Sequence, residues 1–113
     1  MGRKIILTAA QHNWGLHSFD DWQKNFYILY DNGDLRVVVY EGTVITEENY
    51  CISDDNLRYV QENIEHFIMS ADENDACDGE AWEFESGGTR FDLGYIYGSD
   101  LEKIAGILVK ARI

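Results

Sequence analysis

FYILYDNGDLRVVVY, residues 26–40, is the stretch that decides the fold, because apolar side chains alternate on both sides of a central Asn32-Gly33. Asn-Gly is typical of a type I′ turn, whose twist matches that of the flanking strands, so the stretch predicts a β-hairpin. In this register one face is wholly apolar, with the pairs Tyr30–Leu35, Ile28–Val37 and Phe26–Val39. The opposite face is mixed, with the pairs Leu29–Arg36 and Tyr27–Val38.

A second hairpin is predicted around a turn at Gly87-Gly88. Its core face pairs Phe84 with Phe91 and Trp82 with Leu93. Its solvent face pairs Glu85 with Arg90, an attractive contact across the strands, and Glu83 with Asp92. Strand character extends through residues 95–97.

Two segments have the 3.6-residue apolar spacing of a helix. The first begins at Ser53, a predicted N-cap, and has Asp54 and Asp55 in its first turn, where the helix dipole favours anions. Its expected buried positions are Leu57, Val60, Ile64, Phe67 and Ile68. The second begins with a capping-box pattern at residues 99–102, and its expected buried positions are Leu101, Ile104, Ala105 and Leu108.

These elements predict an α+β fold in a single domain over residues 1–113. Residues 3–9 are expected to add a strand. Residues 10–24 are expected to be irregular, with a short helical turn capped by Ser18. The resulting order is strand, hairpin, helix, hairpin, helix. A mainly antiparallel sheet of about five strands with both helices on one face would bury every apolar stripe.

The composition is that of a globular protein that folds without metal or disulfide, with 45% hydrophobic and 13% aromatic residues in 113. No apolar run reaches the roughly 20 residues that cross a bilayer. The apolar stretch near the N-terminus is too short for a secretory signal, so we expect a cytoplasmic location. Cys51 and Cys77 are expected to be thiols in a reducing compartment, and a disulfide between them is the alternative.

The net charge of −12 is concentrated in the middle of the chain. Residues 41–85 hold fourteen acidic residues and one base, Arg58, for a charge of −13, while the remainder carries +1. Direct binding of nucleic acid or of an anionic membrane is disfavoured, because both need Lys and Arg to neutralise phosphates. A basic protein partner or a cation stays open.

Residues 72–80 (DENDACDGE) are the most acidic segment, which we interpret as a solvated loop or a partner-binding loop. A calcium loop fails, since placing Gly79 at its sixth position puts Ala76 where an oxygen ligand is required. His12, His17 and the two cysteines match no zinc spacing. Neither a phosphate-binding glycine loop nor a catalytic constellation is present in the sequence. We therefore expect no metal, no cofactor and no enzymatic activity.

Three stretches resemble a group of small bacterial proteins that have no assigned function. They are ACDGEAWEF at 76–84, GYIYG at 94–98 and LEKI at 101–104, with a weaker similarity at residues 4–9 and 30–33. The similarity covers about the C-terminal third of the chain. It implies a bacterial origin, compatible with a mobile element, and it implies no activity and no functional residues.

The leading hypothesis is a non-enzymatic, acidic protein-binding module that inhibits a basic nucleic-acid-acting protein. Such an inhibitor would be a DNA mimic, an anti-CRISPR-type protein or an immunity protein for a nuclease toxin. Its carboxylates would occupy the Lys/Arg groove that normally binds phosphates. The candidate partner-binding residues are Asp54, Asp55, Glu62, Glu65, Asp72, Glu73, Asp75, Asp78, Glu83 and Glu85.

Two alternatives stay open at the level of sequence, as does the oligomeric state. One is a small regulatory or assembly subunit that binds through the mixed hairpin face, formed by Tyr27, Leu29, Val38 and Tyr40. The other is a small enzyme, which a deep cleft enclosing His12, His17 or Cys77 would support.

Overall fold

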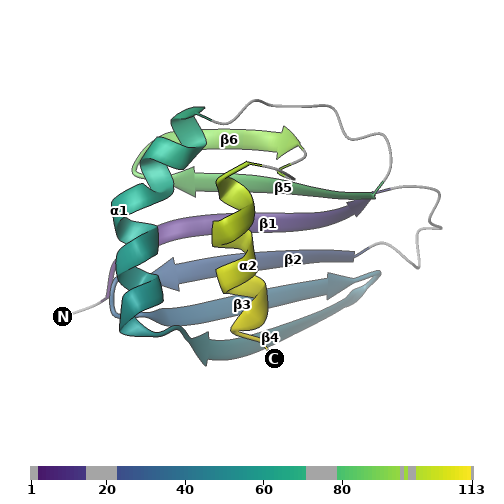
Figure 1. Cartoon of the computed structure of the whole chain (residues 1–113). Helices are drawn as coiled ribbons and strands as arrows, with labels where there is room; N and C mark the ends of the chain where they lie inside the picture. The colour runs from purple at the N-terminus through teal and green to yellow at the C-terminus, as the bar shows by residue number, and fades with distance from the viewer. Residues whose placement is uncertain (1–2, 15–22, 71–78, 95, 97–98, 113) are drawn as a thin grey trace.

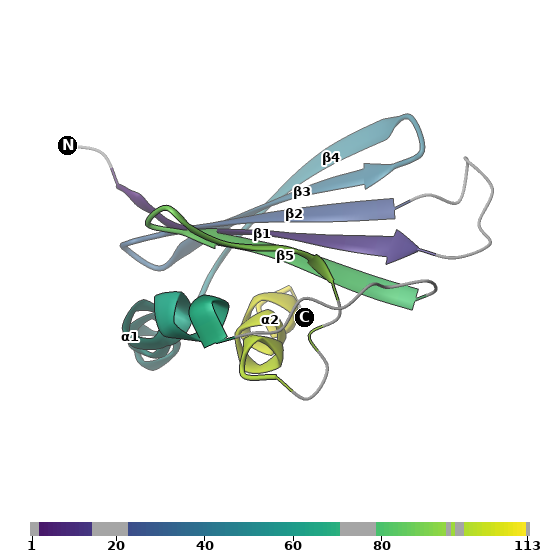
Figure 2. The same cartoon turned by 90° about the horizontal axis from the view of Figure 1, so that it is seen from above.

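The computed structural model describes residues 3–14, 23–70, 79–94, 96 and 99–112, which form one six-stranded antiparallel sheet and two helices (Figure 1). Along the chain the elements are β1 (Ile5–Trp14), β2 (Gln23–Tyr30), β3 (Asp34–Glu41), β4 (Val44–Cys51), α1 (Asp54–Ser70), β5 (Gly79–Ser86), β6 (Thr89–Gly94) and α2 (Leu101–Lys110). Across the sheet the strand order is β4-β3-β2-β1-β5-β6. Both helices lie on the same face of the sheet, as Figure 2 shows from above, so the expected α+β architecture is confirmed.

The sixth strand, β4, is the element that the sequence analysis did not predict. It pairs with β3 through a two-residue turn at Gly42-Thr43 and forms an edge of the sheet. Its sequence, VITEENYC, has polar side chains on both faces, because an edge strand buries little on either side. The period-two alternation that marks a half-buried strand is therefore weak here.

Residues 10–24 were expected to be irregular, and the described part of this stretch is not. Residues 10–14 continue β1, and residues 23–24 begin β2. The two strands are paired as far as His12, which lies opposite Lys24. The helical turn predicted at Ser18 lies outside the described residues.

The first hairpin exists, but its predicted register is wrong by one residue. Leu29 lies opposite Leu35 and Tyr27 opposite Val37. Of the residues near the turn only Gly33 has a positive φ, of 92°, and its N–H donates to the Tyr30 carbonyl over 3.0 Å. This is a type I turn followed by a glycine bulge, which adds one residue to the loop relative to type I′.

The shifted register exchanges the faces of β2. Tyr27 and Leu29 are 1% and 0% exposed and belong to the core, whereas Phe26 and Ile28, expected inside, are half-buried on the opposite side. The faces of β3 were predicted correctly, and Val37 is fully buried. The second hairpin was also predicted correctly near its turn.

At that turn Gly87 and Gly88 both have positive φ, of 56° and 86°, as a type I′ turn requires. The predicted contacts of Phe84 with Phe91 and of Glu85 with Arg90 are confirmed. Farther from the turn a register shift places Trp82 opposite Gly94 instead of Leu93.

The two helices begin differently from one another. The Ser53 hydroxyl accepts a hydrogen bond from the N–H of Asn56 over 3.2 Å, so the predicted cap of α1 is confirmed. At α2 the capping residue is Asp100, which makes no side-chain cap. The Ser99 hydroxyl bonds back to the Ile96 carbonyl, so the expected capping box does not form.

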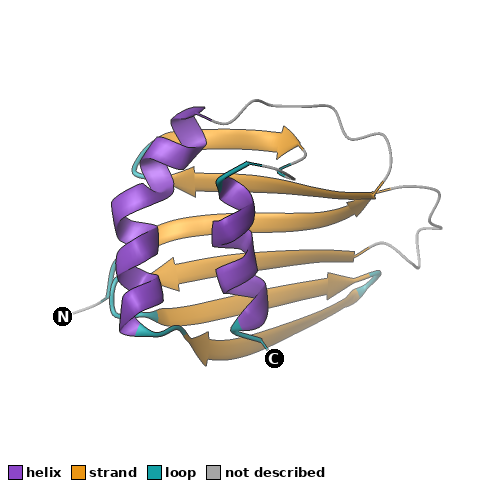
Figure 3. Cartoon of the chain, viewed as in Figure 1, coloured by secondary structure: helices purple, strands orange, loops and turns teal. Residues whose placement is uncertain are grey.

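The core lies between the sheet and the two helices (Figure 3). Tyr27, Trp82 and Phe84 form a continuous stack, with 5.6 Å between successive ring centroids. The helices cover this stack with most of the stripes predicted for them. Leu57, expected to be buried, is half-buried, and the other predicted positions are buried: Val60, Ile64, Phe67 and Ile68 of α1 and Leu101, Ile104, Ala105 and Leu108 of α2. The face of the sheet without helices, which we call the open face, is left to solvent within the described part of the chain.

Candidate functional site

The predicted partner-binding residues fall into three groups. Asp54, Asp55, Glu62 and Glu65 are all exposed on α1. Glu83 and Glu85 lie on β5 and alternate with the buried Trp82 and Phe84, so they point to the open face on the other side of the sheet. The described candidates therefore form two surfaces. Four further candidates lie outside the described residues: Asp72, Glu73, Asp75 and Asp78.

The outward side of α1, with its four exposed acids, is here called the acidic helix surface. Among the residues that the structure describes, none of these carboxylates has an ion pair or a hydrogen bond. Arg58 is the one arginine on α1, which has no lysine and one histidine, His66. Asp55 and Glu62 are two turns apart, about 10 Å along the axis, so the surface extends over a rigid length of helix.

Glu65 also lies against the turn between β5 and β6. A Cβ atom at Gly87 would collide with the Glu65 carboxylate, and the positive φ of Gly87 disfavours a side chain there for a second reason. The close approach of this turn sets the position of the Glu65 carboxylate near the far end of α1.

On the open face Glu83 and Asp92 contact bases, whereas Glu85 has no ion pair among the described residues. The Glu83 carboxylate bonds to His12 Nε2 at 2.9 Å through one oxygen and to Arg90 at 3.3 Å through the other. Arg90 Nε lies 2.6 Å from Asp92. Burial lowers the pKa of His12 below its ordinary value, with Lys24 acting in the same direction and Glu83 opposing both.

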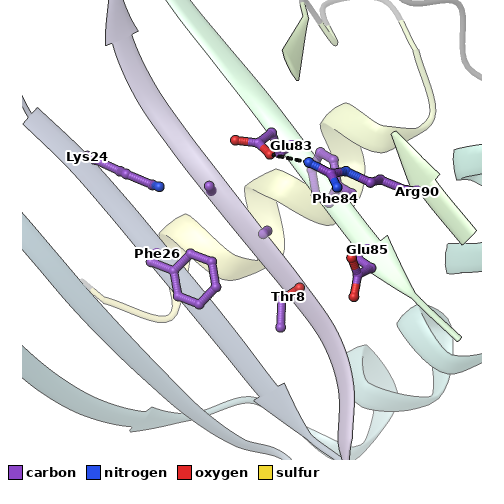
Figure 4. A pocket seen from close by; sticks show the side chains of 9 residues that line it. Thr8, Lys24, Phe26, Glu83, Phe84, Glu85 and Arg90 are labelled. Carbon is purple, nitrogen blue, oxygen red and sulfur yellow. Dashed lines mark hydrogen bonds and ion pairs between the residues drawn. The ribbon is translucent and has the colours of Figure 1, made fainter. Parts of the chain in front are cut away.

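A depression of about 350 Å³ lies beside this cluster on the open face (Figure 4). Lys24 and Phe26 stand on one side of it, Glu83, Glu85 and Arg90 stand on the other, and Thr8 lies between them. Its lining includes no histidine or cysteine, so it is not the cleft that the enzyme hypothesis requires. Both signs of charge line it, with no excess that would favour a strongly charged ligand.

The acids of β4 are also paired, with bases from outside the acidic stretch of the sequence. Arg36 Nη2 lies 2.7 Å from Glu47 Oε2, and Arg112 Nη2 lies 3.0 Å from Glu48 Oε1. Burial alone would lower the pKa of Arg112, but its hydrogen bonds to Tyr27 and Glu48 raise it. Neither pair follows from local sequence, because the first depends on the pairing of β3 with β4 and the second on the contact between the C-terminal end of the chain and β4.

The mixed hairpin face predicted for the alternative hypothesis does not exist as predicted. Tyr27 and Leu29 are in the core as a result of the register shift. Val38 and Tyr40 do lie on the open face, half-buried, and the half-buried Phe26 and Ile28 take the places of the other two. An aromatic and aliphatic surface is thus present on the open face with a changed composition.

The cysteines, possible metal ligands and possible membrane-spanning helices give no further candidate site in the described residues. Cys51 is exposed at the end of β4, while Cys77 and His17 lie outside the described residues. In the described ranges no three His, Cys, Asp or Glu side chains gather as metal ligands would. No described helix is long and apolar enough to cross a membrane. The acidic helix surface and the open face therefore remain the two candidate sites.

Comparison with known proteins leaves these two surfaces to be interpreted from their own chemistry. No protein-family model, no curated protein and no solved structure matches the chain.

Proposed function

We propose that this chain is a non-enzymatic binding module that inhibits a basic, nucleic-acid-acting protein by docking on it through the acidic helix surface. The observation that supports this most is the set of four exposed carboxylates on one helix, Asp54, Asp55, Glu62 and Glu65, with no ion pair among the described residues. Unpaired carboxylates lose no internal partner when they bind Lys or Arg of another protein.

The mechanism is occupation of a phosphate-binding groove. A groove that binds nucleic acid carries Lys and Arg side chains in an array, and carboxylates held along a helix can engage several of them at once. The complementary charges accelerate the encounter, so association should slow as salt screens them. An inhibitor of this kind would act as a DNA mimic, and a nuclease toxin or a CRISPR effector is the class of target that fits.

The test is capture of partners from a lysate of the source cell by the immobilised protein and by two variants of equal charge. Glu62→Lys/Glu65→Lys reverses the acidic helix surface, and Glu41→Lys/Glu102→Lys makes the same charge change on β3 and α2. We expect the wild type and the second variant to retain nucleic-acid-binding proteins that heparin or 0.5 M NaCl elutes. We expect the first variant to lose them. Equal capture by all three proteins would rule out the acidic helix surface.

A regulatory or assembly subunit remains the second candidate function. It is favoured by the open face, where Phe26, Ile28, Val38 and Tyr40 are half-buried and Ile45 of β4 is 65% exposed. Aromatic side chains of this kind are typical of binding hot spots. Capture that is insensitive to salt and lost in Phe26→Ala/Tyr40→Ala would support this function instead of the first.

A further inference from the structure

Among the described residues no strand pairs with the outer edge of β4, here called its free edge, and backbone groups of β4 are directed away from the sheet there. Glu41 and Val44 close a two-residue turn in which only Gly42 has a positive φ, and such a turn makes its closing residues a hydrogen-bonded pair. Hydrogen-bonded and non-bonded pairs then alternate along β3 and β4. At the end of the two strands away from this turn, the hydrogen bond from Ile52 N to Gly33 O, 2.9 Å long, fits the same alternation.

This alternation fixes which residues of β4 face outward. The N–H and C=O groups of Thr46, Glu48 and Tyr50 bond to β3. Those of Ile45, Glu47, Asn49 and Cys51 point to the free edge, where an added strand would find four donors and four acceptors in regular spacing. The edge is eight residues long, which is enough for a full strand.

β4 has a charged pair at its centre, but three other common devices that protect an edge strand are missing from it. Its pairing with β3 contains no bulge, and its sequence contains neither proline nor lysine. Val44 and Ile45 are 59% and 65% exposed and point to opposite faces at the same end of the strand. The other edge, β6, is shorter, has a register shift in its pairing, and carries the exposed Arg90 and Asp92.

The charges at the centre of β4 favour a basic strand over a second copy of this one. Arg36 contacts Oε2 of Glu47, and Arg112 contacts Oε1 of Glu48 through both Nε and Nη2. Within the described chain the second oxygen of each carboxylate has no donor. A lysine or arginine on an added strand can therefore bond to Glu47 on the open face and to Glu48 on the helix side.

Pairing of β4 with the β4 of a second copy is disfavoured by the same charges. When two copies of β4 pair around a two-fold axis through their outward groups, the two longest registers place Glu47 opposite Glu47 or Glu48 opposite Glu48. Like charges directly opposite one another in a sheet are destabilising. The acidic start of α1, at Asp54 and Asp55, follows β4 after two residues and adds to the preference for a basic occupant.

We propose that β4 is a docking edge that binds an extended, basic segment of the partner protein by strand addition. This inference rests on the proposed function for the class of partner, and it adds a mode of binding that the acidic helix surface alone does not supply. Backbone hydrogen bonds would supply affinity, and the pair Glu47 and Glu48 would select lysine or arginine at two adjacent positions of the segment.

The test uses a synthetic peptide, acetyl-Thr-Val-Thr-Val-Lys-Lys-Val-Thr-Val-Thr-amide, whose adjacent lysines point to opposite faces of a strand. Amide hydrogen exchange is followed residue by residue with peptide added up to about 1 mM. We expect exchange at Ile45, Glu47, Asn49 and Cys51 to slow at least tenfold. We expect little change at Thr46, Glu48 and Tyr50, whose amides already bond to β3.

Two peptide controls separate strand addition from general attraction. The same peptide with all of its backbone nitrogens methylated keeps its charge but cannot donate a hydrogen bond along either edge, and the peptide with Glu-Glu in place of Lys-Lys keeps the backbone but reverses the charge. Protection that survives methylation, or that is equal with Glu-Glu, would overturn the proposal. Protection confined to residues outside β4 would overturn it as well.

A matched pair of variants tests the edge from the protein side. Asn49→Pro removes one outward N–H and no bond to β3, while Asn49→Ala keeps the N–H and removes the side chain. With folding checked by circular dichroism, we expect the proline variant to weaken peptide binding at least tenfold and the alanine variant to change it less than twofold. If both variants bind as the wild type does, the edge is not the site.

The outcome also distinguishes this inference from the proposed function. Protection of the β4 amides by the lysine peptide, together with lysate capture that does not depend on Glu62 and Glu65, would leave the docking edge standing without the acidic helix surface. Capture that depends on Glu62 and Glu65, without protection of the β4 amides, would retain the proposed function and reject the docking edge.

Discussion

The acidic helix surface and the open face of the sheet both carry acidic side chains, but only the open face brings bases into contact with them. Glu47, Glu83 and Asp92 each contact an arginine there. The four acids on the outer side of α1 have no such contact among the described residues. Within the described chain, most acids of the open face are therefore compensated by bases, and those of the outer side of α1 are not.

The difference follows from how each element selects its neighbours. Strand pairing brings together residues that are far apart in the sequence, such as His12 and Glu83. An exposed helical side chain reaches mainly the residues three and four positions away, and α1 offers one arginine and no lysine to its four acids. Arg58 lies within that reach of three of the acids, but among the described residues it forms no ion pair with any of them. A run of acids on a helix thus stays uncompensated, and a local count of charges describes the binding potential of α1 better than that of the sheet.

The largest expected effect tests which side chains of β2 belong to the core and which belong to the open face. Tyr27→Ala removes a ring that is 1% exposed and stacked on Trp82, so we expect a loss of about 3–5 kcal/mol in the free energy of unfolding. Phe26→Ala, on the open face, should cost about 1–2 kcal/mol. Urea denaturation of both variants measures the two losses. A larger loss for Phe26→Ala would restore the register predicted from the sequence.

The two hairpins show how far the sequence can determine register. Both turns contain a glycine pair or Asn-Gly, and both predict type I′. At Gly87-Gly88 nothing opposes that turn, and the predicted pairing next to it is confirmed. At Asn32 the side chain accepts the N–H of Asp34 over 3.0 Å and donates to its carboxylate. This local bonding accompanies a type I turn with a bulge, and the apolar pattern, alike on both faces of β2, did not reveal the difference.

The candidate site was predictable to a different extent in each region. The exposure of Asp54, Asp55, Glu62 and Glu65 follows from the helical spacing of the buried residues, and the structure agrees. The placement of Glu83 and Glu85 on the other side of the sheet, away from α1, needed the strand order. The ion pair of Glu48 with Arg112, 64 residues away, also depends on how α2 packs over β4. Such contacts cannot be predicted from the local sequence pattern.

The next largest effect is the salt dependence of the melting temperature, which tests repulsion among the uncompensated acids of α1. Raising NaCl from about 10 to 150 mM shortens the screening length from about 30 to 8 Å, so repulsion among unpaired acids should fall. We expect the melting temperature of the wild type to rise by a few degrees. The melting temperature of the Glu62→Gln/Glu65→Gln variant should rise by less, because two of the repelling charges are gone. An equal rise would place the repulsion elsewhere in the chain.

The pH dependence of stability tests the compensated cluster around His12. Burial lowers the pKa of folded His12 below its ordinary value near 6.5, so its contribution to stability is complete above that value. It is lost as pH falls through 6.5 toward the lower pKa of the folded state, because the unfolded chain binds the proton more readily. His12→Gln should flatten the loss of stability between about pH 7.5 and 5.5. Urea titrations at several pH values measure this, and identical slopes for both proteins would exclude His12 as the cause.

The smallest expected effect is the coupling between Arg112 and Glu48, which ties the end of α2 to the edge strand. The two side chains are 24% and 36% exposed, so the pair is partly shielded from solvent, and a double-mutant cycle with Arg112→Met and Glu48→Gln should give a coupling of up to about 1 kcal/mol. The same cycle with Glu62→Gln in place of Glu48→Gln should give no coupling, because Glu62 has no ion pair among the described residues. The free energies come from urea denaturation of the single and double variants, with the slope of each transition compared to check that the folded state is unchanged. If the cycle with Glu62 shows the larger coupling, the acids of α1 are compensated after all, and the division of the molecule into a paired face and an unpaired face does not hold in solution.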